Sequence, residues 1–261
     1  MSTRDEAWPQ GTPSWVDLSS PDVAASNEFY RTLFGWEIVD TGPENGNYGI
    51  CMVNGRAAAG IGPAQPGSDG PPVWTTYLAV DDVEKVAEAI TANGGTVVMA
   101  PMTVGDQGRM AVAQDPTGAY FGLWEANQMI GMSVRSEPGA VVWNEQMSRD
   151  PDRGREFYAA VFGYTYEPTE GAEAYWTFNT ADGRQAGGLG ALSQTAAADM
   201  PAHWMTYFAV TSADEAVVKV DGAGGTVAQA PFDTPFGRMA AVVDPHGAMF
   251  MIGDDSTAPQ S

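Results

Sequence analysis

The chain of 261 residues carries 33 acidic and 12 basic side chains, which gives a net charge of −21 at pH 7. Such a surface would repel nucleic acids and anionic membranes, so neither is expected as a partner. Cys51 is the only cysteine, which excludes an internal disulfide and a cysteine-based zinc cluster. The polar first residues lack the apolar core of a signal peptide, and no run of about 18 apolar residues occurs, so we expect a cytoplasmic protein.

The first half of the chain is expected to hold two rounds of the same short pattern. A strand at 15–19 precedes Ser20-Pro21, a helix start signal, and the helix should end at Gly35. Strands at 36–40, 48–53 and 56–61 follow. After the Gly- and Pro-rich stretch 62–72 come a strand at 73–80, a helix at 82–92, and strands near 96–99, 110–114 and 119–125. Each round therefore reads strand, helix, three strands.

The second half repeats the first. FYRTLFGW at 29–36 returns as FYAAVFGY at 157–164, WTTYLAV at 74–80 as WMTYFAV at 204–210, and DPTGA at 115–119 as DPHGA at 244–248. GGTV and GRMA also recur, and the matched blocks lie 128 to 130 residues apart. This order and offset indicate a tandem duplication. We therefore expect an α+β protein of four βαβββ modules. Its parts would be a first domain at 1–127 with a polar tail at 1–12, a linker at 128–138, a second domain at 139–253 and a tail at 254–261.

These blocks resemble the vicinal oxygen chelate superfamily, which includes glyoxalase I, extradiol dioxygenases, fosfomycin-resistance enzymes and bleomycin-binding proteins. The resemblance is carried by FYRTLFGW, VDDV, GGTV, GRMA and DPTGA, and it covers nearly the whole chain. More narrowly, the chain is similar to two-domain actinobacterial members, some called a 27-kDa antigen and others hydroxylases of aromatic-polyketide antibiotic pathways. The resemblance implies that paired modules curl into a half-open, glyoxalase-like barrel around a cavity, once in each half.

Catalytic relatives hold a divalent metal in that cavity, and the resemblance implies which positions would supply its ligands. These positions are Trp15, Thr75 and Gly122 in the first half, and Trp143, Met205 and Met251 in the second. None is an imidazole or a carboxylate, the usual ligands of these ions. We therefore expect no metal. We also expect no other cofactor, because GRAAAGIG at 55–62 does not match a dinucleotide or phosphate loop.

Two acids accompany the tryptophans that replace the first metal ligand. A strand alternates its faces, so Trp15 shares a side with Asp17, and Trp143 with Glu145. This side should face the cavity, because the metal positions lie on it. The same alternation adds Tyr77 and Trp124 in the first half, and Tyr207 and, at the mouth, His203 in the second. Aromatic walls, methionines and one acid per cavity are typical of a small-molecule site.

Three roles stay open for Asp17 and Glu145. A carboxylate among indoles has a raised pKa and would suit a general base. It would equally anchor a donor group of a ligand. It could instead pair with an arginine of the GRMA blocks, Arg109 or Arg238.

The strand that carries Glu145 differs from its counterpart. Val16 and Leu18 alternate with the cavity residues of the first half and should point to the helix. In the second half Asn144 and Gln146 take their places, so either they hydrogen-bond in the interior or this strand faces the other way. Cys51, in an apolar strand, is expected to be a buried thiol.

The sequence favours a metal-free binding protein for a planar or aromatic metabolite, such as an aromatic natural product, acting as a monomer or homodimer. In its sharpest form, the ligand lies in the first cavity against Trp15 and Trp124, and Asp17 accepts a donor from it. Two alternatives stay open. One is a hydroxylase-, dioxygenase- or lyase-like enzyme of the superfamily, dependent on a metal or using Asp17 or Glu145 as a base. The other is a scaffold with filled cavities that acts through its outer surface.

Overall fold

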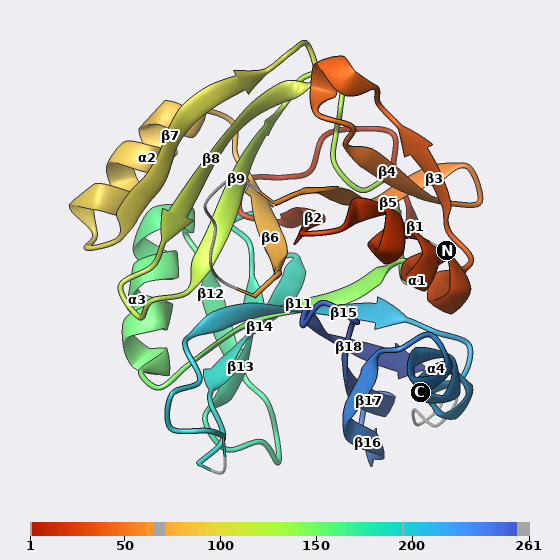
Figure 1. Ribbon diagram of the computed structural model, residues 1–261. Helices are drawn as coiled ribbons and strands as arrows, with labels where there is room; N and C mark the ends of the chain where they lie inside the picture. Colours follow the sequence, from red (N-terminus) through yellow and green to blue (C-terminus); the bar gives the residue numbers. More distant parts are fainter. Residues whose placement is uncertain (1, 65–70, 195, 255–261) are drawn as a thin grey trace.

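The computed structural model describes residues 2–64, 71–194 and 196–254. Within these residues the chain forms two eight-stranded mixed sheets, each built from one half of the chain (Figure 1). The first-half sheet has the order β3-β4-β5-β2-β6-β9-β8-β7, and its strands are β2 Pro13–Ser20, β3 Glu37–Asp40, β4 Gly49–Val53, β5 Arg56–Pro63, β6 Trp74–Ala79, β7 Thr96–Val104, β8 Gly108–Gln114 and β9 Tyr120–Ala126. The second-half sheet has the matching order β12-β13-β14-β11-β15-β18-β17-β16, and its strands are β11 Val141–Ser148, β12 Thr165–Pro168, β13 Tyr175–Asn179, β14 Gln185–Ala191, β15 His203–Ala209, β16 Thr226–Thr234, β17 Gly237–Val243 and β18 Met249–Asp254.

Each half therefore pairs two βαβββ modules through their first strands, β2 with β6 and β11 with β15. The prediction of an α+β fold made of four such modules is confirmed. The helices that complete the modules are α1 Val23–Phe34, α2 Val83–Ala92, α3 Pro151–Phe162 and α4 Ala213–Gly222, and a short 3-10 turn, η1, spans Pro43–Asn45.

Helix capping explains where the two longest helices begin. Asp150 caps α3 as predicted, because its side chain accepts a hydrogen bond from the backbone N–H of Arg153. The predicted cap Ser20 is wrong for α1. Strand β2 runs through Ser20, and Asp22 caps the helix by accepting from the N–H of Ala25.

Strand β7 is longer than its predicted range of 96–99, since it continues to Val104. Pro101 in its middle lacks a backbone N–H donor. The strand tolerates the proline because β7 lies at the edge of its sheet, with register shifts between Val97 and Met102.

The two sheets lie back to back, and each curls away from the other half (Figure 1). Helix α1 packs against α4 and α2 against α3, so the helices meet at the two sides of the interface. The buried core runs across this interface, because Val16 and Leu18 belong to the same apolar cluster as Phe208 and Phe250. We call the side of each sheet that turns away from the other half its concave face.

Two hydrogen bonds tie the halves together reciprocally. The hydroxyl of Tyr30, from the first FY block, donates to Asp244 in the DPHGA turn of the second half, at 3.1 Å. The hydroxyl of Tyr158, from the second FY block, donates to Asp115 in the DPTGA turn of the first half, at 3.0 Å. All four residues are buried. In each half the FY block therefore contacts the DPxGA turn of the other half.

The polar strand residues of the second half do hydrogen-bond in the interior. The side-chain amide of Asn144 donates to the hydroxyls of Thr76 and Thr206, and that of Gln146 donates to Asp115. The positions of β11 that face the interface therefore correspond to those of β2 that face it. Cys51 is fully buried, as predicted.

The predicted tail at 1–12 and linker at 128–138 are held to the body of the protein. Strands β1 Ser2–Thr3 and β10 Val134–Arg135 pair with each other, and the Trp8 indole donates to the carbonyl of Met132 at 2.9 Å. Asp254, expected in a tail, belongs to β18, while 255–261 lie outside the described residues. The domain boundaries themselves stay a prediction.

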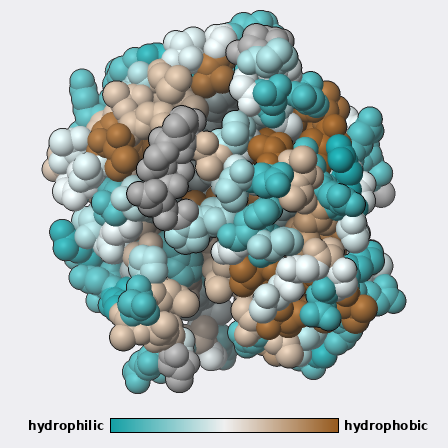
Figure 2. Space-filling view, in the orientation of Figure 1, coloured by the Kyte–Doolittle hydropathy of each residue, from teal (hydrophilic) through white to brown (hydrophobic). Residues whose placement is uncertain are grey.

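The surface reflects the acidic composition. On the face in Figure 2, hydrophilic side chains are spread between separate groups of hydrophobic ones. No helix in the described part of the chain has both the length and the apolar character needed to cross a membrane.

Candidate carboxylate–tyrosine sites

The acid of the first half lies on the concave face. Thr76 contacts Asn144 of the other half, so its neighbours Thr75 and Tyr77 turn the opposite way. In the sheet, Trp15 is paired with Tyr77 and Asp17 with Thr75, so both residues of β2 share that face. The predicted facing is thereby supported by the register.

A tyrosine that the sequence reasoning missed connects Trp15 to Asp17. The indole N–H of Trp15 donates to the Tyr48 hydroxyl at 2.8 Å, and that hydroxyl donates to Asp17 Oδ2 at 3.1 Å. The Tyr77 hydroxyl lies close enough to the Asp17 carboxylate to lower its pKa. Because an indole N–H can only donate, the chain of hydrogen bonds runs in one direction and ends on the acid.

The second half contains the same arrangement. The indole N–H of Trp143 donates to the Tyr175 hydroxyl at 2.9 Å, and this hydroxyl donates to Glu145 Oε2 at 2.7 Å. The hydroxyl of Tyr207 donates to Glu145 Oε1 at 2.6 Å. We call each set of one tryptophan, two tyrosines and one acid a carboxylate–tyrosine site.

Glycines hold the missed tyrosines in place. A Cβ atom on Gly60 would lie 1.8 Å from the Tyr48 hydroxyl, and one on Gly188 would lie 1.9 Å from the Tyr175 hydroxyl. Any side chain there would displace the ring. The alternating glycines at 60 and 62 recur at 188 and 190, and this repeat was the signal that could have revealed the two tyrosines.

Burial dominates the electrostatics of both acids. It raises the pKa of Asp17 to about 7, although the hydrogen bonds from Tyr48 and Tyr77 act in the opposite direction. Burial likewise raises the pKa of Glu145, again opposed by its tyrosines. The pKa values of Tyr48, Tyr77 and Tyr207 are also raised by burial, so these hydroxyls stay protonated and can donate.

Pairing of the two acids with the GRMA arginines is wrong. Arg109 forms its ion pairs with Glu84 and Glu125, and Arg238 forms its ion pairs with Asp214 and Asp233, in both cases on the surface. Within the described residues, neither Asp17 nor Glu145 has a cationic partner. Tyrosine hydroxyls take the place that an arginine was expected to fill.

The other predicted cavity residues lie on the strand beside each acid, β6 or β15, or on the next strand, β9 or β18. Gly122 is paired with Tyr77, and a Cβ atom at Gly122 would lie 2.0 Å from the Tyr77 ring, so the ring covers this glycine. The Trp124 indole donates to the carbonyl of Met129 at 2.8 Å. In the second half the strand partners are Met205 opposite Glu145, Met251 opposite Tyr207, and His203 opposite Met147.

The inherited metal positions do not suit a divalent ion. In the first half they hold an indole, a hydroxyl and a glycine, and in the second an indole and two thioethers, where imidazole or carboxylate would be needed. The acids beside them already accept hydrogen bonds from tyrosines. In the part of the chain that the structure describes, no three His, Cys, Asp or Glu side chains converge.

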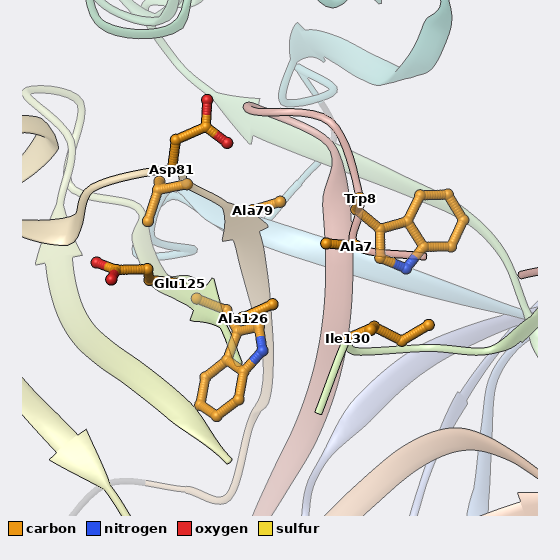
Figure 3. Close-up of a pocket in the computed structure, with 9 residues that line it drawn as sticks. Ala7, Trp8, Ala79, Asp81, Glu125, Ala126 and Ile130 are labelled. Atoms are coloured by element: carbon orange, nitrogen blue, oxygen red, sulfur yellow. The ribbon is translucent and has the colours of Figure 1, made fainter. Parts of the chain in front are cut away.

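A cavity of about 210 Å³ adjoins the first site, at the end where Trp124 lies. Trp8 and Ile130 lie on one side of it and Asp81 and Glu125 on the other (Figure 3). Trp15, Thr75 and Tyr77 do not line it. Its volume is below the roughly 300–1,000 Å³ of ordinary ligand pockets.

Comparison with known proteins places this fold and these repeated modules in one family. Residues 12–123 match the model of the Glyoxalase/Bleomycin resistance protein/Dioxygenase superfamily, and residues 140–253 match that of a glyoxalase-like domain. A protein of Mycobacterium tuberculosis named "Putative glyoxylase CFP32" is 41% identical over 259 residues, which cover 97% of each chain. The chain therefore belongs to the glyoxalase/bleomycin resistance/dioxygenase superfamily.

A second relative carries a different name. The anthracycline biosynthesis protein DnrV of Streptomyces peucetius is 37% identical over 262 residues, which cover 93% of this chain and 92% of that one.

Solved structures share the fold at low identity. The Mn(II)-bound glyoxalase of Novosphingobium aromaticivorans gives a TM-score of 0.65 at 15% identity, with 95% of this chain and 83% of that one covered. The 2,3-dioxygenase LapB of Pseudomonas sp. KL28 gives 0.63 at 13% identity, with 96% and 95% covered. At this level of identity the likeness shows the fold alone.

Proposed function

We propose that this protein binds a planar small molecule at its carboxylate–tyrosine sites, without using a divalent metal. The observation that carries the proposal is the occurrence of the same polar arrangement in both halves, around Asp17 and around Glu145. Broad aromatic faces for stacking surround a single acceptor group in each case, as is usual in small-molecule sites.

The direction of the hydrogen bonds indicates that the ligand should carry a donor group. Asp17 accepts from Tyr48, Glu145 accepts from Tyr175 and Tyr207, and a carboxylate has further lone pairs that can accept from a ligand. A hydroxyl or amine of the ligand would supply that donor. An anionic ligand is disfavoured, because it would meet a carboxylate and a protein with a net charge of −21. The ligand class is therefore a neutral or cationic planar ring system that carries an O–H or N–H donor.

The relatives agree with this class. DnrV is named for anthracycline biosynthesis. Anthracyclines contain flat fused rings with phenolic hydroxyls, so they combine a stacking face with donors. We propose aromatic natural products of this kind, or metabolites of the same chemistry, as ligands of the present protein.

The test uses 2,6-dihydroxynaphthalene as the probe and 2,6-dimethoxynaphthalene, which has no donor, as its control. Titration calorimetry should show micromolar binding of the diol and at least tenfold weaker binding of the ether, because one charge-assisted hydrogen bond contributes roughly 1.5–3 kcal/mol. Glu145→Gln should reduce the preference for the diol. Equal affinity for diol and ether, or no binding of either, would overturn the proposal.

A second candidate function is proton transfer, and the pKa of about 7 at Asp17 favours it. A general base works best when its pKa lies near the ambient pH. The Asp17 carboxylate would take a proton from the carbon beside a ligand carbonyl and leave an enolate. Incubation of 2-tetralone in D2O, followed by proton NMR, should then show exchange that Asp17→Asn abolishes. Exchange at the uncatalysed rate would remove this candidate.

A further inference from the structure

We infer that the two carboxylate–tyrosine sites are not equivalent: the second-half site receives the ligand, and the first-half site is a closed copy of it. This inference rests on the proposed function and assigns it to one place. It is carried by an exchange of small and large residues near the two acids. The first half has Gly122 and Trp124, whereas the equivalent positions of the second half hold Met251 and Gly253.

The first-half site is closed by its own tyrosine. Gly122 leaves the surface of β9 bare, and the Tyr77 ring lies directly on it, where a Cβ atom would be only 2.0 Å from the ring. Trp15 is 4% exposed and Tyr77 is 7% exposed. A flat ligand would have to displace Tyr77 to stack on Trp15.

Trp124 closes the end of the same site. Its indole donates to the Met129 carbonyl and covers Gly108, where a Cβ atom would lie 2.7 Å from the ring. Trp124 is only 7% exposed. The space that remains beyond it is the 210 Å³ cavity, which Trp8 and Ile130 bound from the other side (Figure 3). That space is smaller than the roughly 300–1,000 Å³ of ordinary ligand pockets.

The second-half site has the opposite pattern. Met251 stands where the first half has Gly122, so Tyr207 cannot lie flat on the strand as Tyr77 does. Glu145 is one methylene longer than Asp17 and still accepts from the Tyr207 hydroxyl at 2.6 Å. Trp143 and Tyr207 are both partly exposed, unlike their first-half counterparts, although Glu145 itself is 8% exposed and Asp17 is partly exposed.

Gly253 stands where the first half has Trp124. A Cβ atom at 253 would meet one side chain, that of Met239, at an ordinary contact distance of 3.5 Å. Among the described residues, no aromatic ring lies within 4 Å of this Cβ position. Met205, partly exposed beside Glu145, and Met239 supply flexible thioether walls that adapt to irregular ligand shapes. The ligand would stack on Trp143, donate to Glu145 and extend over Gly253.

The test fills this end of the site. Gly253→Leu should fold, because its Cβ contact is ordinary, and it should weaken binding of 2,6-dihydroxynaphthalene at least tenfold. Gly222→Leu is the matched control, since Gly222 is exposed and has nothing within 4 Å of its Cβ position. The control should bind one probe per chain with wild-type affinity. Wild-type affinity in Gly253→Leu would overturn the inference.

The reciprocal change opens the first half. Trp124→Gly should raise the number of probe molecules bound per chain from one to two. Should this variant not fold, Trp124→Leu serves the same purpose with a smaller loss of volume. Two sites in the unmodified protein would contradict the inference. The proposed function fails separately, if the unmodified protein does not prefer the diol to the ether.

Discussion

The two carboxylate–tyrosine sites use the same polar groups in different surroundings. Around Asp17 the aromatic rings pack tightly, with Tyr77 on Gly122 and Trp15 almost fully buried. Around Glu145 the corresponding tryptophan and tyrosine are partly exposed. A duplicated arrangement can thus pack its aromatic rings more tightly in one copy than in the other, depending on where glycines lie near it.

The largest effect should come from truncating the two tryptophans. Trp15→Ala should cost about 3–5 kcal/mol of unfolding free energy, because it removes a buried indole and the donor to Tyr48. Trp143→Ala should cost about 1–2 kcal/mol, since part of that side chain is already in water. Urea unfolding followed by circular dichroism measures both. Equal losses would show that the two sites are packed alike.

Asp17 should make stability depend on pH in a way that Asp17→Asn removes. Between about pH 4 and pH 7 the folded protein holds a proton on Asp17 that the unfolded chain has lost, because burial raises the pKa of Asp17 to about 7. Unfolding free energy therefore falls as pH rises through this window, by an amount on the order of 1–3 kcal/mol.

The measurement is the difference in unfolding free energy between wild type and Asp17→Asn at pH 4.5 and at pH 8. The variant should gain relative to wild type at the higher pH. A difference that does not change with pH would mean that Asp17 is ionised at all these values.

The glycines beneath Tyr48 and Tyr175 offer a smaller test of both sites. Gly60→Ala and Gly188→Ala should each displace a tyrosine and cost about 1–2 kcal/mol, through a lost hydrogen bond to a carboxylate. Gly60→Ala should also raise the pKa of Asp17 further, because the Tyr48 hydrogen bond lowers it. Carbon-13 NMR of the carboxyl group reads that pKa. Gly222→Ala is the matched control and should leave both quantities unchanged.

The smallest effect is expected at the interface side of β11. Asn144 is fully buried, its amide donates to two threonines, and its carbonyl oxygen has no partner among the described residues. Asn144→Val copies the residue found at Val16 in the first half. The cost of the lost hydrogen bonds and the gain from removing the unpaired oxygen nearly cancel. The free energy of unfolding should therefore change by no more than about 1 kcal/mol, as measured by thermal unfolding. A collapse of the fold would show that the amide network is essential.

Much of the fold could be read from local patterns. The repeated blocks gave the four modules, and the alternation along 13–20 placed Trp15 and Asp17 on one side of a strand. The cap of α1 was misplaced by two residues, because β2 continues through Ser20 and its hydroxyl accepts from the N–H of Asp22. Strand β7 was predicted too short, and its position at the sheet edge, where Pro101 is tolerated, could not be seen from the sequence.

The candidate sites were predicted only in part. The tryptophans, the acids, Tyr77 and Tyr207 follow from strand alternation. Tyr48, just before β4, and Tyr175, the first residue of β13, do not. Each reaches its acid across the strand between them, over glycines more than ten residues away in the chain. The expected arginine partners failed for a similar reason: Arg109 turns to surface acids that no strand pattern brings to it.

The sequence by itself determined the duplication, the module order and the residue types that face each cavity, because these depend on spacing along one strand or helix. Only the tertiary structure decided that Tyr30 bonds Asp244 and Tyr158 bonds Asp115, since each pair joins motifs more than 40 residues apart across the interface. It also decided that the Tyr77 ring lies on Gly122, while the strand partner of Tyr207 is Met251. Whether a tyrosine ring can lie flat on the next strand depends on whether the residue opposite it has a Cβ atom. Which residue lies opposite is decided by strand pairing in the sheet, because paired strands can be far apart in the sequence.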